Sequence, residues 1–141
     1  NILLGKVPFP GDIADCDHIP LRAEAYRCGA VFSLQIDVAG QRIFHLGSAN
    51  LVESTLAPRE VDLLLLCVAG WTTTDRFTTR VMRALSPRRV LLSHWDNFLR
   101  PMQEGAHALP AMRVPRLIEG LRAESRDLSV GALPLLGDLW V

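Results

Sequence analysis

The sequence has no excess of charge of either sign and no long apolar run. Fifteen basic and fifteen acidic residues give a formal net charge of zero. Overall charge therefore does not favour binding to nucleic acid or to a membrane surface, and we predict neither partner. No apolar run approaches the roughly 18 residues of a membrane-spanning helix. The chain also starts at Asn1 without an initiator Met or a signal-peptide pattern, and we interpret it as an interior portion of a longer chain.

Cysteines are few: Cys16, Cys28 and Cys67 are odd in number and widely spaced. The absence of a C-x-x-C pair argues against a zinc ribbon and against a dithiol redox motif. This pattern favours a reducing compartment, and we predict a cytoplasmic location. Cys67 lies in an apolar run and is expected to be a small core residue.

The sequence contains enough hydrophobic residues to form the core of one globular domain. Of 141 residues, 49% are hydrophobic and 21% are charged, which is typical of a folded chain and not of a disordered one. We treat residues 1–141 as a single portion of one domain. Within it, residues 1–27 are rich in prolines and glycines and are predicted to form an irregular connection.

The strands are predicted from their apolar patterns. Apolar residues alternate with small or polar ones over 30–38, and residues 42–46 return as a hairpin partner. A nearly continuous apolar run over 61–68 is typical of a strand buried on both faces. Further strands are expected over 89–93 and 128–136.

Two helices are predicted between the later strands. The first has an apolar stripe formed by Phe77, Val81 and Leu85, and it ends before Pro87. The second begins near Pro115, a residue suited to a first helical turn. Its apolar face consists of Leu117, Ile118 and Leu121. The strand–helix–strand order over 61–93 predicts a parallel neighbour with a right-handed crossover. The expected α/β fold is one sheet with helices on one face, and its other face would need cover from elsewhere.

Polar side chains lie at the ends of two predicted strands. His45 and Ser48 belong to the end of one strand and the turn after it, and His94 and Asp96 follow another. In layered α/β proteins, ligands bind outside the carboxyl ends of parallel strands. The sequence therefore places its best candidate functional residues, His94 above all, at this edge of the sheet.

Residues 28–102 resemble the second half of a metallo-β-lactamase-fold hydrolase. In that family a strand ends in a Tyr/Phe-x-x-Gly-Asp turn, and residues 43–48 here read IFHLGS. A later strand of the family ends in Pro-x-His followed by an aromatic and a small polar residue, and residues 90–98 here read VLLSHWDNF. The resemblance implies half of a four-layer αββα sandwich, with a mixed sheet and helices on one face.

By this resemblance the intact protein is a metal-dependent hydrolase. The family implies zinc and a metal-bound hydroxide that attacks an ester, lactone, amide or phosphodiester of a small molecule. His94 matches a metal ligand of the family, and Ser48 stands where the family has its metal-bridging Asp. Asp96 and His45 are then expected to contact the substrate or to orient the ligands. The missing N-terminal half of the domain, or a partner chain, would cover the second face of the sheet, and a homo-oligomer is a further option.

Two departures from the family pattern keep a second hypothesis open. The family's main metal motif, His-x-His-x-Asp-His, does not occur in the sequence, and residues 22–26 lack the family's middle histidine. Ser48 is a poor bridging ligand, because the metals concerned favour carboxylate and imidazole. The alternative to a hydrolase is therefore a non-catalytic binding module that kept the fold and lost the site. A third option is that a separate half-chain completes the site.

Single residues also allow simpler interpretations. His45 fits a half-buried structural histidine as well as a functional one. Ser48 could hold a metal-bound water or cap its turn. A serine-hydrolase site is not indicated, because residues 47–49 lack the G-x-S-x-G nucleophile turn. The Ser-His-x-Asp run at 93–96 is also too compact to converge as a triad.

Overall fold

The computed structural model describes residues 9–11, 22, 25, 27–28, 31–56, 60–97 and 100–132. The chain divides into two units, Asn1–Phe32 and Ser33–Val141. In the first unit, β1 (Phe9–Pro10) pairs in parallel with β2 (Arg27–Cys28). This short pairing includes three residues of the region predicted to be irregular, Phe9, Pro10 and Arg27, and the sequence pattern did not indicate it.

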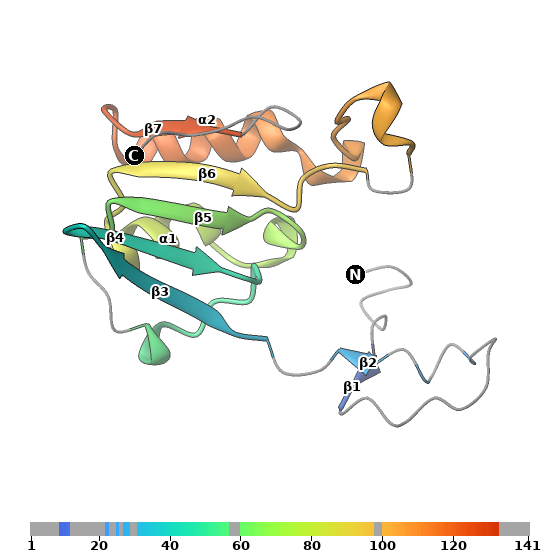
Figure 1. Cartoon of the computed structure of the whole chain (residues 1–141), viewed down its shortest axis with the longest axis horizontal. Coiled ribbons are helices and arrows are strands. Elements are labelled where there is room, and N and C mark those ends of the chain that lie inside the picture. The colour runs from blue at the N-terminus through green and yellow to red at the C-terminus, as the bar shows by residue number, and fades with distance from the viewer. Residues whose placement is uncertain are drawn as a thin grey trace. The chain divides into compact units, whose positions relative to one another are not determined.

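The second unit is an α/β fold built on a five-stranded mixed sheet (Figure 1). The strands, in spatial order, are β3 (Ser33–Val38), β4 (Gln41–Leu46), β5 (Leu63–Cys67), β6 (Arg89–Ser93) and β7 (Ser129–Gly131). The β3–β4 hairpin is antiparallel, and β4 to β7 run parallel to one another. The strands predicted over 42–46, 61–68 and 89–93 are confirmed, and the strand predicted from the alternation over 30–38 begins at Ser33. β7 is shorter than the strand predicted over 128–136, of which residues 133–136 lie outside the described residues.

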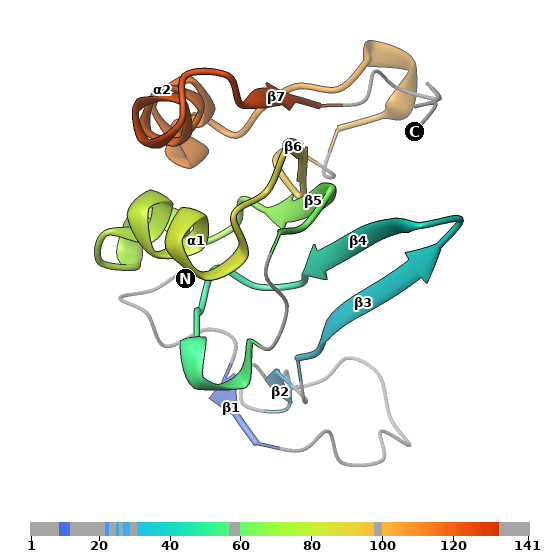
Figure 2. The same cartoon turned by 90° about the vertical axis from the view of Figure 1, so that its left-hand side faces the viewer.

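Helices α1 (Phe77–Leu85) and α2 (Val114–Glu124) lie on the same side of this sheet (Figure 2). The short 3-10 turns are η2 (Glu53–Thr55), η3 (Trp71–Thr73), η4 (Met102–Glu104) and η5 (Pro110–Met112). The predicted stripe of α1 is confirmed, because its three residues are all buried. In α2, Leu117 and Leu121 are buried, whereas Ile118 is half-buried against the core. Neither described helix has the length and apolarity that crossing a bilayer requires.

The hydrophobic core lies between the sheet and the two helices. Successive residues of a strand point to opposite faces, so one set of alternate residues meets the helices. In β4 to β6 this set is Phe44, Leu46, Leu64, Leu66, Val90 and Leu92, and all six are buried in one cluster with the helical stripes. Burial of this kind is the main source of stability of the fold.

The opposite face of the sheet, here called the open face, is covered by no helix of the described residues. Pairing places Leu34 of β3 beside His45 of β4 and Ile36 beside Ile43, on the side away from Phe44 and Leu46. Leu34, Ile36 and Val38 are 54%, 48% and 53% exposed. The alternating apolar residues of β3 thus stay exposed among the described residues. The reason is that β3 is an edge strand and its apolar side faces away from the helices.

Arg80 of α1 holds the loop after β4 against the helix. Its guanidinium donates hydrogen bonds to both carboxylate oxygens of Glu53, one of them at 2.9 Å, and to the Leu51 carbonyl oxygen at 2.9 Å. Hydrogen bonding from Arg80 is the main cause that lowers the pKa of Glu53 from 4.5 to about 2.

Glu53→Gln is therefore expected to destabilise the fold at neutral pH and to lose this effect in acid. A carboxyl group whose folded-state pKa is depressed stabilises above its unfolded-state pKa, here 4.5, and this contribution disappears as the pH falls toward about 2. Because the Glu53–Arg80 pair is partly solvent-exposed, the expected difference in free energy of unfolding between wild type and variant is small. Urea unfolding at a series of pH values should show the wild-type and variant free energies converging within this window. A difference between the two free energies of unfolding that stays constant with pH would contradict the role of the Glu53–Arg80 pair. Arg80→Met should show the same pH trend as Glu53→Gln.

Candidate functional site

The carboxyl ends of β4, β5 and β6 meet at one edge of the sheet, because these strands are parallel (Figure 1). The segments that leave the strands at this edge are 47–50 after β4, 68–71 after β5 and 94–97 after β6. They include two of the predicted metal-site residues, Ser48 and His94. The edge is therefore where the sequence analysis and the topology agree on a candidate site.

His94 and Cys67 are in contact at this edge. Cys67 is the last residue of β5, and its Sγ lies 3.6 Å from Nδ1 of His94, which directly follows β6. The Val68 N–H donates to the Ser93 carbonyl oxygen at 2.9 Å and extends the pairing of the two strands to this point. The Cys67 side chain is buried, at 4% exposure, whereas His94 is exposed.

The backbone of His94 departs from strand geometry. Cys67 and Ser93 are register partners and lie on the same face of the sheet, and regular alternation would turn the next side chain to the other face. His94 instead has a φ of 55°, in the left-handed region, where histidine occurs more readily than most residues. This conformation ends the alternation at Ser93 and accompanies the approach of the imidazole to Cys67.

Cys67 lies on the open face of the sheet. It shares that face with Leu63 and Leu65, and it is absent from the core cluster that contains Leu64 and Leu66. Burial raises the pKa of its thiol, and a backbone hydrogen bond at Ala69 only partly offsets this effect. A protonated, buried thiol is a weak nucleophile, so the contact with His94 does not favour a cysteine-hydrolase dyad.

Ser48 caps the turn after β4. Its Oγ accepts a hydrogen bond from the Asn50 N–H at 3.1 Å, which is the simpler of the two roles that the sequence left open. The Thr74 hydroxyl donates to the Ala49 carbonyl oxygen at 2.8 Å and joins this turn to the segment before α1. Two hydrogen bonds thus stabilise the turn that contains Ser48.

Asp96 and His45 are placed by the strands around them. Asp96 is half-buried and forms an isolated antiparallel bridge with Ala108. His45 is half-buried within β4, beside Leu65 of β5, which is two residues before Cys67. In the part of the chain that the structure describes, no three His, Cys, Asp or Glu side chains converge on one metal position. The structure brings together Cys67 and His94, and the other predicted residues do not join them in such a group.

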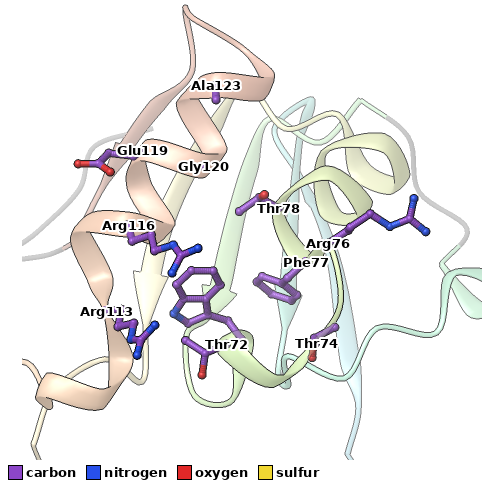
Figure 3. Close-up of a pocket in the computed structure, with 11 residues that line it drawn as sticks. Thr72, Thr74, Arg76, Phe77, Thr78, Arg113, Arg116, Glu119, Gly120 and Ala123 are labelled. Atoms are coloured by element: carbon purple, nitrogen blue, oxygen red, sulfur yellow. The ribbon is translucent and has the colours of Figure 1, made fainter.

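A second feature is a groove of about 500 Å³ between α1 and α2. Figure 3 shows Arg113, the residue before α2, and Arg116 of α2 pointing into this space, whereas Arg76 and Glu119 point away from it. Guanidinium groups recognise carboxylates and phosphates, so the groove has the chemistry of an anion-binding surface. No sequence motif indicated it, because its residues come from two segments about 40 positions apart that meet only through helix packing.

Comparison of the chain with models of known families, with curated proteins and with solved structures found no match.

Proposed function

We propose that this chain forms one half of a metallo-β-lactamase-type domain and contributes one side of a zinc-dependent hydrolase site. The observation that carries the proposal is the exposed imidazole of His94 at the carboxyl end of β6, beside the carboxyl end of the parallel strand β5. Ligand sites of layered α/β folds lie at this edge. The residue is also the one that the family resemblance aligns with a metal ligand.

The open face of the sheet supports the same proposal. In an αββα sandwich, each sheet carries helices on one face and packs against the other sheet with its second face. Among the described residues both helices lie on one side, and the exposed apolar residues of β3 lie on the other. The proposed occupant of the open face is the complementary half-domain, supplied by the same protein or by a partner chain.

The residues present fit zinc in part. Zinc binds imidazole nitrogen, thiolate sulfur and carboxylate oxygen, and His94 lies in contact with a thiol and two residues before Asp96. A catalytic zinc site has three protein ligands, which is more than converge within the described residues. In the proposal, the complementary half supplies the remaining ligands.

When bound, zinc would polarise an ester, lactone, amide or phosphodiester of a small molecule and activate a water. The residues of this chain would bind the metal and orient its ligands and the substrate. His94 would bind the metal, and the Ser48–Asn50 hydrogen bond would keep the adjacent turn in place. Asp96 and His45 are proposed to orient the ligands or to contact the substrate.

The rival proposal is a non-catalytic module with the same fold. Ser48 in place of a carboxylate favours it, since a hydroxyl is a poor metal-bridging group. Such a module would use the open face or the arginine groove to bind a partner. The cytoplasmic location and the homo-oligomer stay predictions under either proposal.

Hydrolysis assays distinguish the two proposals. The full-length protein, with its complementary half, is expected to hydrolyse at least one of a p-nitrophenyl ester, a lactone and a phosphodiester. The rate should fall on chelation and return with zinc. A zinc-loaded protein with no turnover would favour the binding module, whereas a rate that chelator leaves unchanged would contradict the zinc-dependent mechanism.

Ser48→Asp is expected to raise the zinc content from about one ion to about two per site, because it restores an anionic bridging ligand of the kind that two-metal hydrolases use. The new carboxylate can still accept the Asn50 N–H, so the turn should be kept. Elemental analysis of the zinc-loaded proteins measures the difference. Ser48→Asn is the uncharged control, and equal zinc content in the wild type and the Asp variant would contradict the bridging position.

A further inference from the structure

We infer that the arginine groove between α1 and α2 is a second binding site, in which Arg113 and Arg116 hold the phosphate group of a small molecule. This inference goes beyond the proposed hydrolase site and does not depend on it. The groove lies among the helices, on one side of the sheet, whereas the complementary half is proposed to cover the open face on the other side. A ligand could therefore reach the groove in the complete domain.

The two arginines concentrate positive charge in the groove. Arg113 directly precedes α2 and Arg116 follows three positions later, about one helical turn away. Both side chains point into the groove, whereas the other charged lining residues, Arg76 and Glu119, point away from it (Figure 3). Within the described ranges neither Arg113 nor Arg116 forms a salt bridge. Both guanidinium groups therefore have donors available for an anion.

The walls of the groove are held in place before a ligand binds. The buried side chain of Phe77 contributes to its floor. The indole N–H of Trp71 donates a hydrogen bond to the Met112 carbonyl oxygen and ties η3 to the residue before Arg113. This bond sets the position of the start of α2 relative to the opposite wall. A preorganised site lowers the entropic cost of binding.

A phosphate monoester fits this lining better than a carboxylate does. It carries a charge of about −1.5 to −2 at neutral pH and three terminal oxygens that accept hydrogen bonds, whereas a carboxylate carries one charge and two oxygens. Two guanidinium groups match that charge and can donate to phosphate in pairs of hydrogen bonds. Thr72 and Thr78 add hydroxyl groups to the same lining.

The groove is larger than a phosphate group alone requires. Its volume of about 500 Å³ lies within the range of about 300–1,000 Å³ that is typical of small-molecule sites. Gly120 keeps the space between the helices free, because a Cβ atom there would lie only 3.0 Å from Cγ2 of Thr78. The half-buried Trp71 lines the same space and offers apolar surface to the organic part of a ligand. The expected ligand is therefore a phosphorylated small molecule.

Calorimetric titration of the full-length protein tests the inference. The ligands are inorganic phosphate, glucose 6-phosphate and AMP. Glucose and adenosine are the neutral controls, and glucuronate is the carboxylate counterpart of glucose 6-phosphate. A phosphoserine peptide and a short oligonucleotide test for a macromolecular ligand instead.

The variants Arg113→Asn and Arg116→Gln each remove one guanidinium group from the groove. Asparagine suits the φ of 45° at Arg113. Arg76→Asn is its matched control, because Arg76 also precedes a helix, with a φ of 44°, and points away from the groove. Arg122→Gln is the control for Arg116→Gln, since Arg122 is an exposed arginine of α2 outside the groove lining. His94→Asn reports on the separate edge of the sheet, and circular dichroism confirms that each variant is folded.

We expect glucose 6-phosphate or AMP to bind, and each groove variant to weaken that binding by about 10-fold or more, because a charge-assisted hydrogen bond is lost. Arg76→Asn, Arg122→Gln and His94→Asn should keep the wild-type affinity, and glucuronate should bind more weakly than glucose 6-phosphate. The same affinity in the wild type and in both folded groove variants would overturn the inference.

Three further outcomes would also overturn it. Binding lost in His94→Asn but kept in the groove variants would assign the ligand to the sheet edge and leave the hydrolase proposal standing. Binding of no phosphate monoester would exclude the ligand class. Binding restricted to the phosphoserine peptide or to the oligonucleotide would indicate a macromolecular partner.

Discussion

Replacement of His94 is expected to weaken zinc binding by more than about 100-fold. Loss of a residue that merely orients a ligand costs roughly 10- to 100-fold in metal affinity, so loss of a ligand should cost at least as much. The described residues offer no group of three or more metal-binding side chains that could retain the ion without it. Competition of the full-length protein with a chromophoric zinc chelator gives the two dissociation constants.

The choice of substitution at His94 matters because of its backbone. With a φ of 55°, alanine would be strained and could lower stability for reasons unrelated to metal. Asparagine adopts the left-handed region more easily and lacks the imidazole, so His94→Asn and His94→Ala should show the same loss of affinity. His107→Ala is the matched control, because His107 is an exposed histidine that contacts the Glu104 carbonyl oxygen. An unchanged zinc dissociation constant in folded His94→Asn would contradict the assignment of His94 as a metal ligand.

Leu64→Ala is expected to lower the free energy of unfolding by about 2–5 kcal/mol, the range for a large-to-small change in a packed core. Leu64 is fully buried in β5, between β4 and β6, on the face that meets the helices. Removal of its side chain leaves a cavity under α1 and α2 that the neighbouring strands cannot close. Urea unfolding followed by circular dichroism measures the change as a lower midpoint at constant slope.

Leu65→Ala is the matched control for this prediction. Leu65 is the next residue of the same strand, but it lies on the open face and is only half-buried. Truncation of Leu65 in this chain alone should lower the free energy of unfolding by about 1 kcal/mol, because it removes less buried apolar surface than truncation of Leu64 does. Equal losses for the two variants would contradict the assignment of one packed and one open face. If the complementary half covers the open face, the cost of Leu65→Ala should rise in the complete protein.

Most of the fold could be predicted from local patterns. The stripe of α1 has a helical period, and the short, continuous apolar run of β5 is typical of a strand buried on both faces. The structure confirms both elements. The alternation over 33–38 correctly indicated a strand. It could not indicate exposure, because burial depends on which face receives the helices, and that is a property of the whole sheet.

The candidate site was predictable only in part, for a physical reason. His94 follows an obvious strand and precedes polar residues, so its position at the sheet edge could be read from the chain. The approach of Cys67 depends on the register of β5 against β6 and on the left-handed backbone of His94. Neither is visible in a local pattern. Cys67 was correctly expected to be buried, and an apolar neighbourhood alone does not distinguish a core thiol from one that faces a histidine.

Native mass spectrometry of the full-length protein after exposure to zinc tests the central claim most directly, because it reports bound metal and bound partner chains together. The proposed site predicts about one zinc ion per site, lost in folded His94→Asn and retained in His107→Ala. A protein that stays free of metal in the presence of excess zinc, with its complementary half bound, would contradict the metal site and leave the binding module as the better account.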